Sequence, residues 1–276
     1  MRCTVRQIIW LSIFVLLLIA PVLIMAVAPR PQSRQIVRDI AVACGFLGLS
    51  LMGLQFIPTA RLHVLTETFP LDTTYVVHHQ LSKASFFLVL AHPILLILDN
   101  PYNFVAFNIF GAPWRLLAGV AAFALMLLLV ATSAWRLWLR LDYEAWRGLH
   151  DVLSVAVGGF ALYHILKVDY FTSLPIQRAL WIAFGVLWVV IIGYIRIYKP
   201  WRMLQHPFEI TDMIEERGNV WSMVIEAADH EGIEFSAGQV AWLTVGHSPF
   251  RIEEHPFSFS SSAERPERLA FAIKEL

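Results

Sequence analysis

Long apolar runs constrain this chain more than any other feature of its sequence. The run from Ile8 to Val27 is twenty residues long, and Ser12 is its only polar side chain. A helix needs about 20 apolar residues to cross the hydrocarbon core of a bilayer. Six such runs can be read, at 8–27, 36–57, 75–98, 114–137, 150–166 and 176–197. They predict an α-helical membrane protein with a six-helix transmembrane bundle.

The first run has one feature of a secretory signal peptide, because the small residues Ala26 and Ala28 follow its core. That core is longer than the roughly 7–15 residues of a signal peptide. Pro29 also stands where cleavage would have to occur. We therefore interpret the run as a retained first helix.

The distribution of basic residues predicts the orientation in the membrane. An even number of spans places both termini on one side, and that side receives nine of the basic residues near the spans against six on the other. By the positive-inside rule both termini are cytoplasmic, which makes this a multi-pass protein of the cell (inner) membrane. The first outer loop, which is rich in arginine, argues the other way.

The character of the sequence changes near Pro200. Residues 1–199 carry fifteen Lys and Arg against eight Asp and Glu, whereas residues 200–276 carry six against thirteen. Beyond this boundary, short alternating segments replace the apolar runs, and Arg217, Gly218 and Asn219 form a turn signal between the first two. We predict a transmembrane domain at 1–199 and part of a β-barrel or sandwich at 200–276. Nothing in the sequence suggests a nucleic-acid-binding surface.

Four histidines in the third and fifth runs share one spacing. His78 and His92 are fourteen residues apart, and so are His150 and His164. Fourteen residues of α-helix rise about 21 Å and turn through about 1400°, which is about 40° short of four full turns. Each pair therefore lies on nearly one face of its helix. The two runs have the same direction, so they bring His78 opposite His150 and His92 opposite His164.

Two bis-histidine sites stacked across a bilayer are the arrangement that two b-type haems need. Neutral imidazole is a good axial ligand for haem iron, and two imidazoles leave no open coordination position, which suits electron transfer. Histidine within hydrocarbon is costly and indicates a functional site. A single membrane histidine, however, often only hydrogen-bonds to a neighbouring helix. His79 stays an alternative to His78, at a spacing of thirteen.

Basic side chains near the ends of the runs are candidates for contacts to haem propionates, since carboxylates at an interface favour arginine partners. Arg136, Arg140 and Arg147 are placed for the inner haem. Arg115 and Lys167 are placed for the outer one. Each of them also suits an ordinary anchoring role at the membrane surface.

Several segments resemble a known family. HHQLSKASFFLVLAHP and YEAWRGLHDVLSVAVGGFALYH are similar to the transmembrane domain of ferric reductases and NADPH oxidases, of the bacterial type. HPFSFSSS resembles the flavin-binding signature of that family, and GQVAWLTV resembles the strand before it. The resemblance implies that residues 200–276 begin an FAD-binding β-barrel. It also implies that FAD is contacted by His255, Pro256, Phe257 and Ser258.

The resemblance further implies a transmembrane path for electrons. NAD(P)H reduces FAD in the cytoplasm, and electrons pass to an inner haem on His78 and His150. They continue to an outer haem on His92 and His164, and then to an acceptor such as oxygen or ferric iron. Such a protein is an NAD(P)H-dependent oxidoreductase.

The sequence departs from the family pattern at the inner site and beyond the flavin signature. His79 stands where the family usually has arginine, and Ser82 where it usually has glycine, which bears on packing and propionate contacts around the inner haem. No GxGxxG or comparable glycine-rich loop occurs. We therefore expect the nucleotide-binding domain, and with it the NAD(P)H site, to follow residue 276 in a longer protein.

Two other classes of protein compete with this interpretation. A dihaem cytochrome b that carries electrons from a quinol or a separate reductase has the same histidine spacing. The segment after Pro200 argues against it, because a pure cytochrome has no need of a flavin-type barrel. A haem-free transporter or channel would use charges within its spans, and these are few, Lys83 being the clearest.

Overall fold

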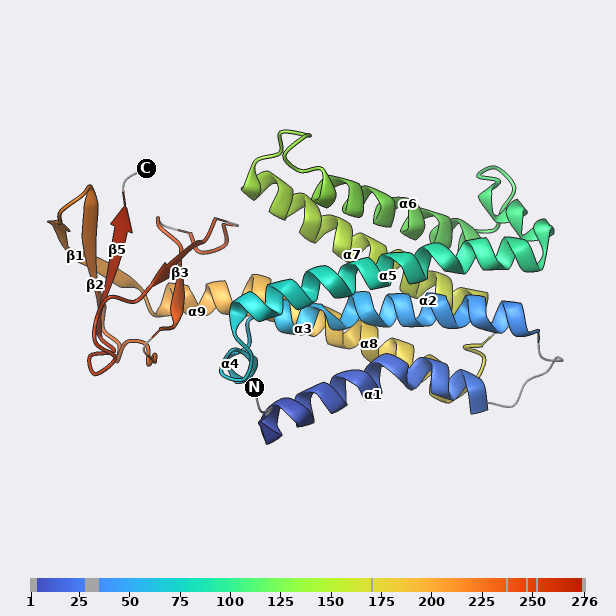
Figure 1. Ribbon diagram of the computed structural model, residues 1–276, viewed down its shortest axis with the longest axis horizontal. Coiled ribbons are helices and arrows are strands. Elements are labelled where there is room, and N and C mark those ends of the chain that lie inside the picture. The colour runs from blue at the N-terminus through green and yellow to red at the C-terminus, as the bar shows by residue number, and fades with distance from the viewer. Residues whose placement is uncertain are drawn as a thin grey trace. The chain divides into compact units, whose positions relative to one another are not determined.

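The computed structural model describes residues 4–27, 35–169, 171–236, 238–246, 248–251 and 253–274. These residues form two compact units, one ending at Ile192 and one beginning at Gly193. Long helices make up the first unit, and strands dominate the second (Figure 1). The assignment of domains to 1–199 and 200–276 stays a prediction.

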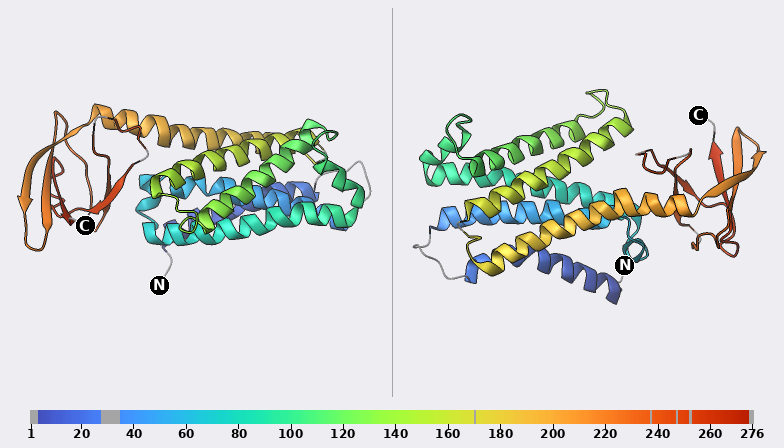
Figure 2. Two further views of the ribbon diagram at one scale, coloured as in Figure 1. Left: turned by 90° about the horizontal axis from the view of Figure 1, so that it is seen from above. Right: turned by 180° about the vertical axis from the view of Figure 1, so that it is seen from behind.

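Six long helices run alongside one another in the first unit (Figures 1 and 2). They are α1 (Val5–Val27), α2 (Ile36–Leu54), α5 (Leu71–Asp99), α6 (Trp114–Ala134), α7 (Tyr143–Val168) and α8 (Pro175–Gly193). Short helical pieces lie between them, namely α3 (Phe56–Thr59), α4 (His63–Thr66) and the 3-10 helix η1 (Pro101–Phe107). All six long helices are apolar and long enough to cross a membrane. The predicted multi-pass α-helical bundle is thereby confirmed.

The helix ends differ from the ends of the apolar runs. α7 begins at Tyr143, seven residues before the predicted start at His150, and α5 begins at Leu71 rather than at Tyr75. The added first turns carry polar residues such as Asp72 and Glu144, whose charges favour a helix N-terminus. Hydropathy marks the part of a helix that lies in hydrocarbon, whereas the helix itself continues into the polar interface.

Bulky side chains from five helices fill the centre of the bundle. Trp181, Phe184 and Trp188 of α8 pack against Phe46, Leu49 and Met52 of α2 in a cluster that also takes in residues of α1, α6 and α7. Gly53 of α2 makes this contact possible, because a Cβ at that position would overlap the indole ring of Trp188. Small residues commonly allow such close approach between membrane helices.

The helices pair in a way that determines where the histidines lie. α5 packs closely on α2, and α7 packs closely on α6. The hydroxyl of Ser85 in α5 donates a hydrogen bond of 2.8 Å to the carbonyl of Gly48 in α2, where the absent glycine side chain leaves room. Of the twenty-nine residues of α5, Ser85 alone is fully buried by the described protein. The faces of α5 away from α2 are thus left to lipid or to a ligand.

The second unit begins with a turn of π-helix (Tyr194–Tyr198) and α9 (Lys199–Gln205), and continues as strands. The strands are β1 (Phe208–Glu215), β2 (Val220–Ala227), β3 (Val240–Leu243), β4 (His255–Ser258) and β5 (Arg268–Lys274). The predicted turn joins β1 to β2, with Gly218 and Asn219 at positive φ angles of 78° and 58°. Each predicted strand segment contains a strand.

Two antiparallel sheets form from these strands, one in the order β1-β2-β5 and the other from β3 and β4. A bridge between Phe259 and Phe271 connects β5 to the residue after β4. Their small core contains Met223, Ile225 and Leu269. The sheets do not close into a barrel within the described residues, and the incomplete FAD-type barrel stays a prediction.

Candidate functional site

The four histidines of equal spacing lie in two facing pairs between α5 and α7. The ring centres of His78 and His150 are 6.3 Å apart, with 67° between the ring planes. Those of His92 and His164 are 6.5 Å apart, with 78° between the planes. The two pairs are therefore near copies of each other, about 21 Å apart along the helices.

The rotation of α5 distinguishes His78 from its neighbour. Adjacent residues of an α-helix point about 100° apart, so only one of His78 and His79 can face α7. The ring of His78 lies opposite His150, whereas His79 is exposed. The role of His78 as a ligand stays a prediction, but the geometry favours it over His79.

The outer pair is anchored to backbone carbonyls of the neighbouring helices. Nδ1 of His92 donates to the carbonyl of Ala41 in α2 at 2.8 Å, and Nδ1 of His164 donates to the carbonyl of Arg115 in α6 at 2.7 Å. A carbonyl can only accept, so both Nδ1 atoms carry the hydrogen. Each Nε2 therefore keeps a free lone pair, which is the tautomer that a metal-binding histidine needs.

The inner pair is held by different partners. Nδ1 of His150 lies 3.2 Å from the hydroxyl oxygen of Ser133, which also receives the indole N–H of Trp146 at 3.4 Å. The hydroxyl of Ser133 itself donates to the carbonyl of Leu129 at 2.8 Å, so its oxygen is free to accept from both rings. Nδ1 of His78 is buried and has no hydrogen-bond partner among the described residues.

The ring separations fit an iron ion held between two imidazoles. A metal–nitrogen bond of about 2 Å, plus about 1.1 Å from nitrogen to ring centre on each side, gives about 6.2 Å between ring centres. The described residues contain no group of three or more His, Cys, Asp or Glu side chains that could hold a metal ion without help. Each histidine pair offers two nitrogen atoms, which is the number of axial ligands that a b-type haem takes from a protein. Haem binding at the two pairs stays a prediction.

The predicted propionate partners lie at different places around the pairs. Arg136 stacks its guanidinium on Tyr143 and Trp146, at 5.9 and 5.8 Å from the ring centres, and Trp146 in turn contacts His150. Arg140 adopts a left-handed conformation in the turn before α7. Arg147 lies in the first turns of α7, Arg115 in the first turn of α6 and Lys167 in the last turn of α7. Their propionate contacts stay predictions.

The predicted flavin contacts all belong to β4. His255, Pro256 and Ser258 are exposed, whereas Phe257 is half-buried and packs against the small core of the second unit. β4 pairs with β3 in a register that sets Phe257 opposite Ala241. The structure leaves the polar members of this strand accessible to a ligand, and their contact with FAD stays a prediction.

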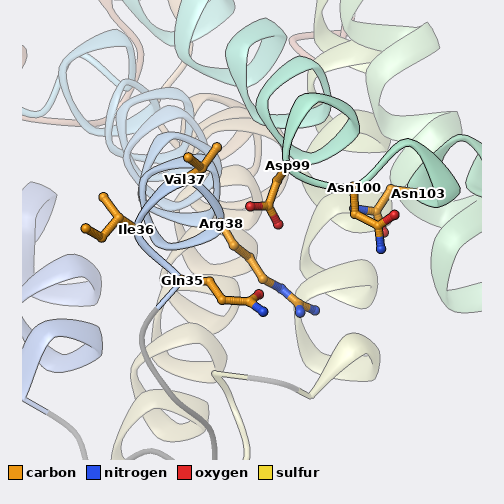
Figure 3. A pocket seen from close by; sticks show the side chains of 7 residues that line it. All are labelled: Gln35, Ile36, Val37, Arg38, Asp99, Asn100 and Asn103. Carbon is orange, nitrogen blue, oxygen red and sulfur yellow. The ribbon is translucent and has the colours of Figure 1, made fainter.

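A polar cavity of about 520 Å³ lies where the first turn of α2 meets the end of α5 and η1. Side chains of Arg38 and Asp99 point into the space between these helix ends, and Asn100 and Asn103 line the far side (Figure 3). Arg38 is three residues from Ala41, whose carbonyl holds His92. The cavity therefore lies at the same end of the bundle as the outer pair.

Sequence reasoning missed the residues that hold the histidines in place. Ala41 and Arg115 act through backbone carbonyls, which no side-chain motif reveals. Gly45 and Gly119 lie directly against the rings of His92 and His164. The glycines are visible in the sequence, but they cannot be assigned to the histidines before the helices are paired.

Comparisons with known proteins show what part of the membrane domain is similar to. Residues 44–162 match the family described as ferric reductase like transmembrane component. An uncharacterized protein from Archaeoglobus fulgidus is 27% identical over 139 residues, which cover 48% of this chain and 75% of that protein. The matched residues include His78, His92 and His150, whereas His164 lies just beyond their end. They also include Gly45, Arg115 and Gly119, but not Ala41. Residues 44–162 are therefore similar to the transmembrane component of ferric reductases.

Proposed function

We propose that this chain carries electrons across a membrane between two b-type haems, one held by His78 and His150 and the other by His92 and His164. The similarity of residues 44–162 to the transmembrane component of ferric reductases supports a transmembrane oxidoreductase. The observation that supports the finer proposal is the pair of facing imidazole sets, at 6.3 and 6.5 Å between ring centres. A bound haem supplies reversible one-electron chemistry at an iron with no open position.

The protein's own residues orient the histidine rings and supply the apolar surroundings of the two sites. The carbonyls of Ala41 and Arg115 fix the protonated nitrogen of His92 and His164, which leaves Nε2 to bind iron. Ser133 does the same for His150. Leu149 and Ile165, the chain neighbours of His150 and His164, pack against the apolar core of the bundle, which would limit the access of water. With no open position, the site favours electron transfer over binding of oxygen to the metal.

A donor and an acceptor complete the proposal. Electrons from NAD(P)H, delivered by FAD bound at β4, enter on the side of the inner pair, which is the cytoplasmic side of the cell (inner) membrane, with both termini cytoplasmic. An acceptor such as oxygen or ferric iron takes them on the side of the outer pair. The cavity beside Arg38 and Asp99 lies at that end and is a candidate place for the acceptor (Figure 3).

Haem content tests the central claim. Because each facing pair supplies one complete set of axial ligands, we expect the protein purified in detergent to contain about two haems per chain. The reduced-minus-oxidised absorption spectrum should be of the b type and low-spin. A pyridine haemochrome assay against protein concentration measures the ratio. A colourless preparation from haem-sufficient cells would rule out the proposal.

Flavin binding separates the two functions that share the histidine spacing. In a protein that continues past residue 276 and so completes the expected flavin barrel, we expect FAD to co-purify or to be retained on titration. A His255→Ala, Ser258→Ala double variant of that protein should lose at least tenfold in FAD affinity, since it removes two exposed polar contacts worth about 1 kcal/mol each. The fluorescence of released FAD measures this. A Glu264→Ala variant, at an exposed position after the β4 segment, is the control. A protein with two haems that bound no FAD, or whose FAD affinity was unchanged in the double variant, would instead favour a dihaem cytochrome b. Such a protein would receive its electrons from a quinol or a separate reductase.

A further inference from the structure

We propose that Gly45 and Gly119 are positioning residues for the outer histidine pair. Each provides the space that allows an imidazole to reach a carbonyl within an intact helix. The inference rests on the proposed function, because the imidazoles are positioned to bind iron. We refer to the carbonyl of one residue and the glycine four residues later as a carbonyl–glycine pair, formed by Ala41 with Gly45 and by Arg115 with Gly119.

The imidazole rings of His92 and His164 lie so close to Gly45 and Gly119 that no larger residue would fit at either position. A Cβ added to Gly45 would lie 2.9 Å from Nδ1 and 3.1 Å from Cγ of His92. A Cβ added to Gly119 would lie 2.7 Å from Nδ1 and 2.8 Å from Cε1 of His164. In both cases the nearest atom is the nitrogen that donates to the carbonyl. A side chain at either position would therefore displace the ring from its hydrogen bond.

Helix geometry explains why glycine is needed four residues after the carbonyl. In an α-helix the carbonyl of residue i already accepts the N–H of residue i+4. A second donor has to approach the same oxygen from the side, next to residue i+4. Any Cβ there occupies the approach that the imidazole uses. The ring cannot simply rotate away, because its other nitrogen has to face the opposite histidine at 6.5 Å between ring centres.

The carbonyl–glycine pair occurs twice, on separate helices. Arg115 and Gly119 in α6 lie 74 residues after Ala41 and Gly45 in α2, and His164 lies 72 residues after His92. α2 packs on α5, and α6 packs on α7, so each helix pair presents its histidine to its own carbonyl–glycine pair. Two independent occurrences argue against a chance contact.

The carbonyl–glycine pairs contact the outer histidine pair alone. Nδ1 of His150 is held by the Ser133 hydroxyl instead of a helix carbonyl, and Nδ1 of His78 has no partner among the described residues. A hydrogen bond from Nδ1 to a carbonyl increases the electron donation of the imidazole to a metal. Its loss therefore weakens ligation and raises the midpoint potential, and it does so only at the outer site. A glycine with a purely structural role would not produce this selectivity.

Gly119→Ala and Gly45→Ala variants of the whole chain test the inference. We expect the outer haem to bind about 10–100-fold more weakly, as is typical when a partner of a metal-binding histidine is lost. Where the haem is retained, its midpoint potential rises, and its low-spin ferric EPR line shifts, because that line depends on the angle between the two imidazole planes. The component that is missing from a His164→Leu protein identifies the outer haem. The inner haem should keep its content and potential, and so reports that the bundle is folded.

Gly159→Ala is the matched control, because a Cβ at this position in α7 meets no atom within 4 Å. Both haems should be unchanged in it. Wild-type content, potential and EPR lines in Gly119→Ala and Gly45→Ala would overturn the inference while leaving the dihaem function intact. Equal loss of both haems in these variants would also overturn it, since it would reveal a general packing role. A wild-type protein without haem would instead contradict the proposed function itself.

Discussion

We expect a His164→Leu protein to contain about one haem per chain instead of about two. Leucine removes the only ring that lies opposite His92, and the described residues offer no third ligating group at this level. A single imidazole holds a haem far more weakly than a facing pair does, so the outer haem is lost on purification. Whatever fraction remains is five-coordinate and therefore high-spin. The absorption spectrum and the pyridine haemochrome ratio measure both effects.

The opposite ligand and a neighbouring residue provide the controls for this experiment. His92→Leu should give the same spectrum as His164→Leu, because both changes break the same site. Tyr163→Leu alters the adjacent position of α7, whose side chain is exposed, and should retain both haems. Full low-spin haem content in either histidine variant would show that these two residues do not form one site.

How much of the fold and of the histidine site could be predicted from the sequence depends on how far apart in the chain the interacting residues lie. The spans and the strands follow from local patterns of hydropathy and alternation, and the structure contains both. The ends of α7 were missed because its first turn is polar and yet helical. The facing of His92 and His164 could be predicted because helical rotation is regular over fourteen residues.

The contacts that orient the histidines were beyond local patterns. The carbonyl of Ala41 is 51 residues from His92 in the chain, and that of Arg115 is 49 residues from His164. Backbone carbonyls carry no residue type, so the only trace in the sequence is a glycine whose partner is unknown until the helices are paired. Likewise, the choice between His78 and His79 depends on how α5 is rotated against α2, which is set by contacts such as Ser85 with Gly48.

Variants of the inner site should also lose a whole haem, and they decide by experiment between His78 and His79 as the ligand. We expect His78→Leu to lose the inner haem and to keep the outer one, because the ring of His78 faces His150 at 6.3 Å. His79→Leu should keep both haems, since its side chain is exposed. The two variants differ by one position in the same helix, so they serve as matched controls for each other. A haem lost from His79→Leu but retained in His78→Leu would reverse the assignment.

Double variants then test the pairing of the ligands, because two changes within one site cannot be additive. His78→Leu combined with His150→Leu should lose the same single haem as either change alone. His78→Leu combined with His164→Leu should lose both haems, since the two residues belong to different levels of the bundle. The haem ratio distinguishes these outcomes without any donor or acceptor. If the first combination removed both haems and the second only one, His78 would share a haem with His164 instead of His150. Electrons could then not follow the path from His78 and His150 to His92 and His164.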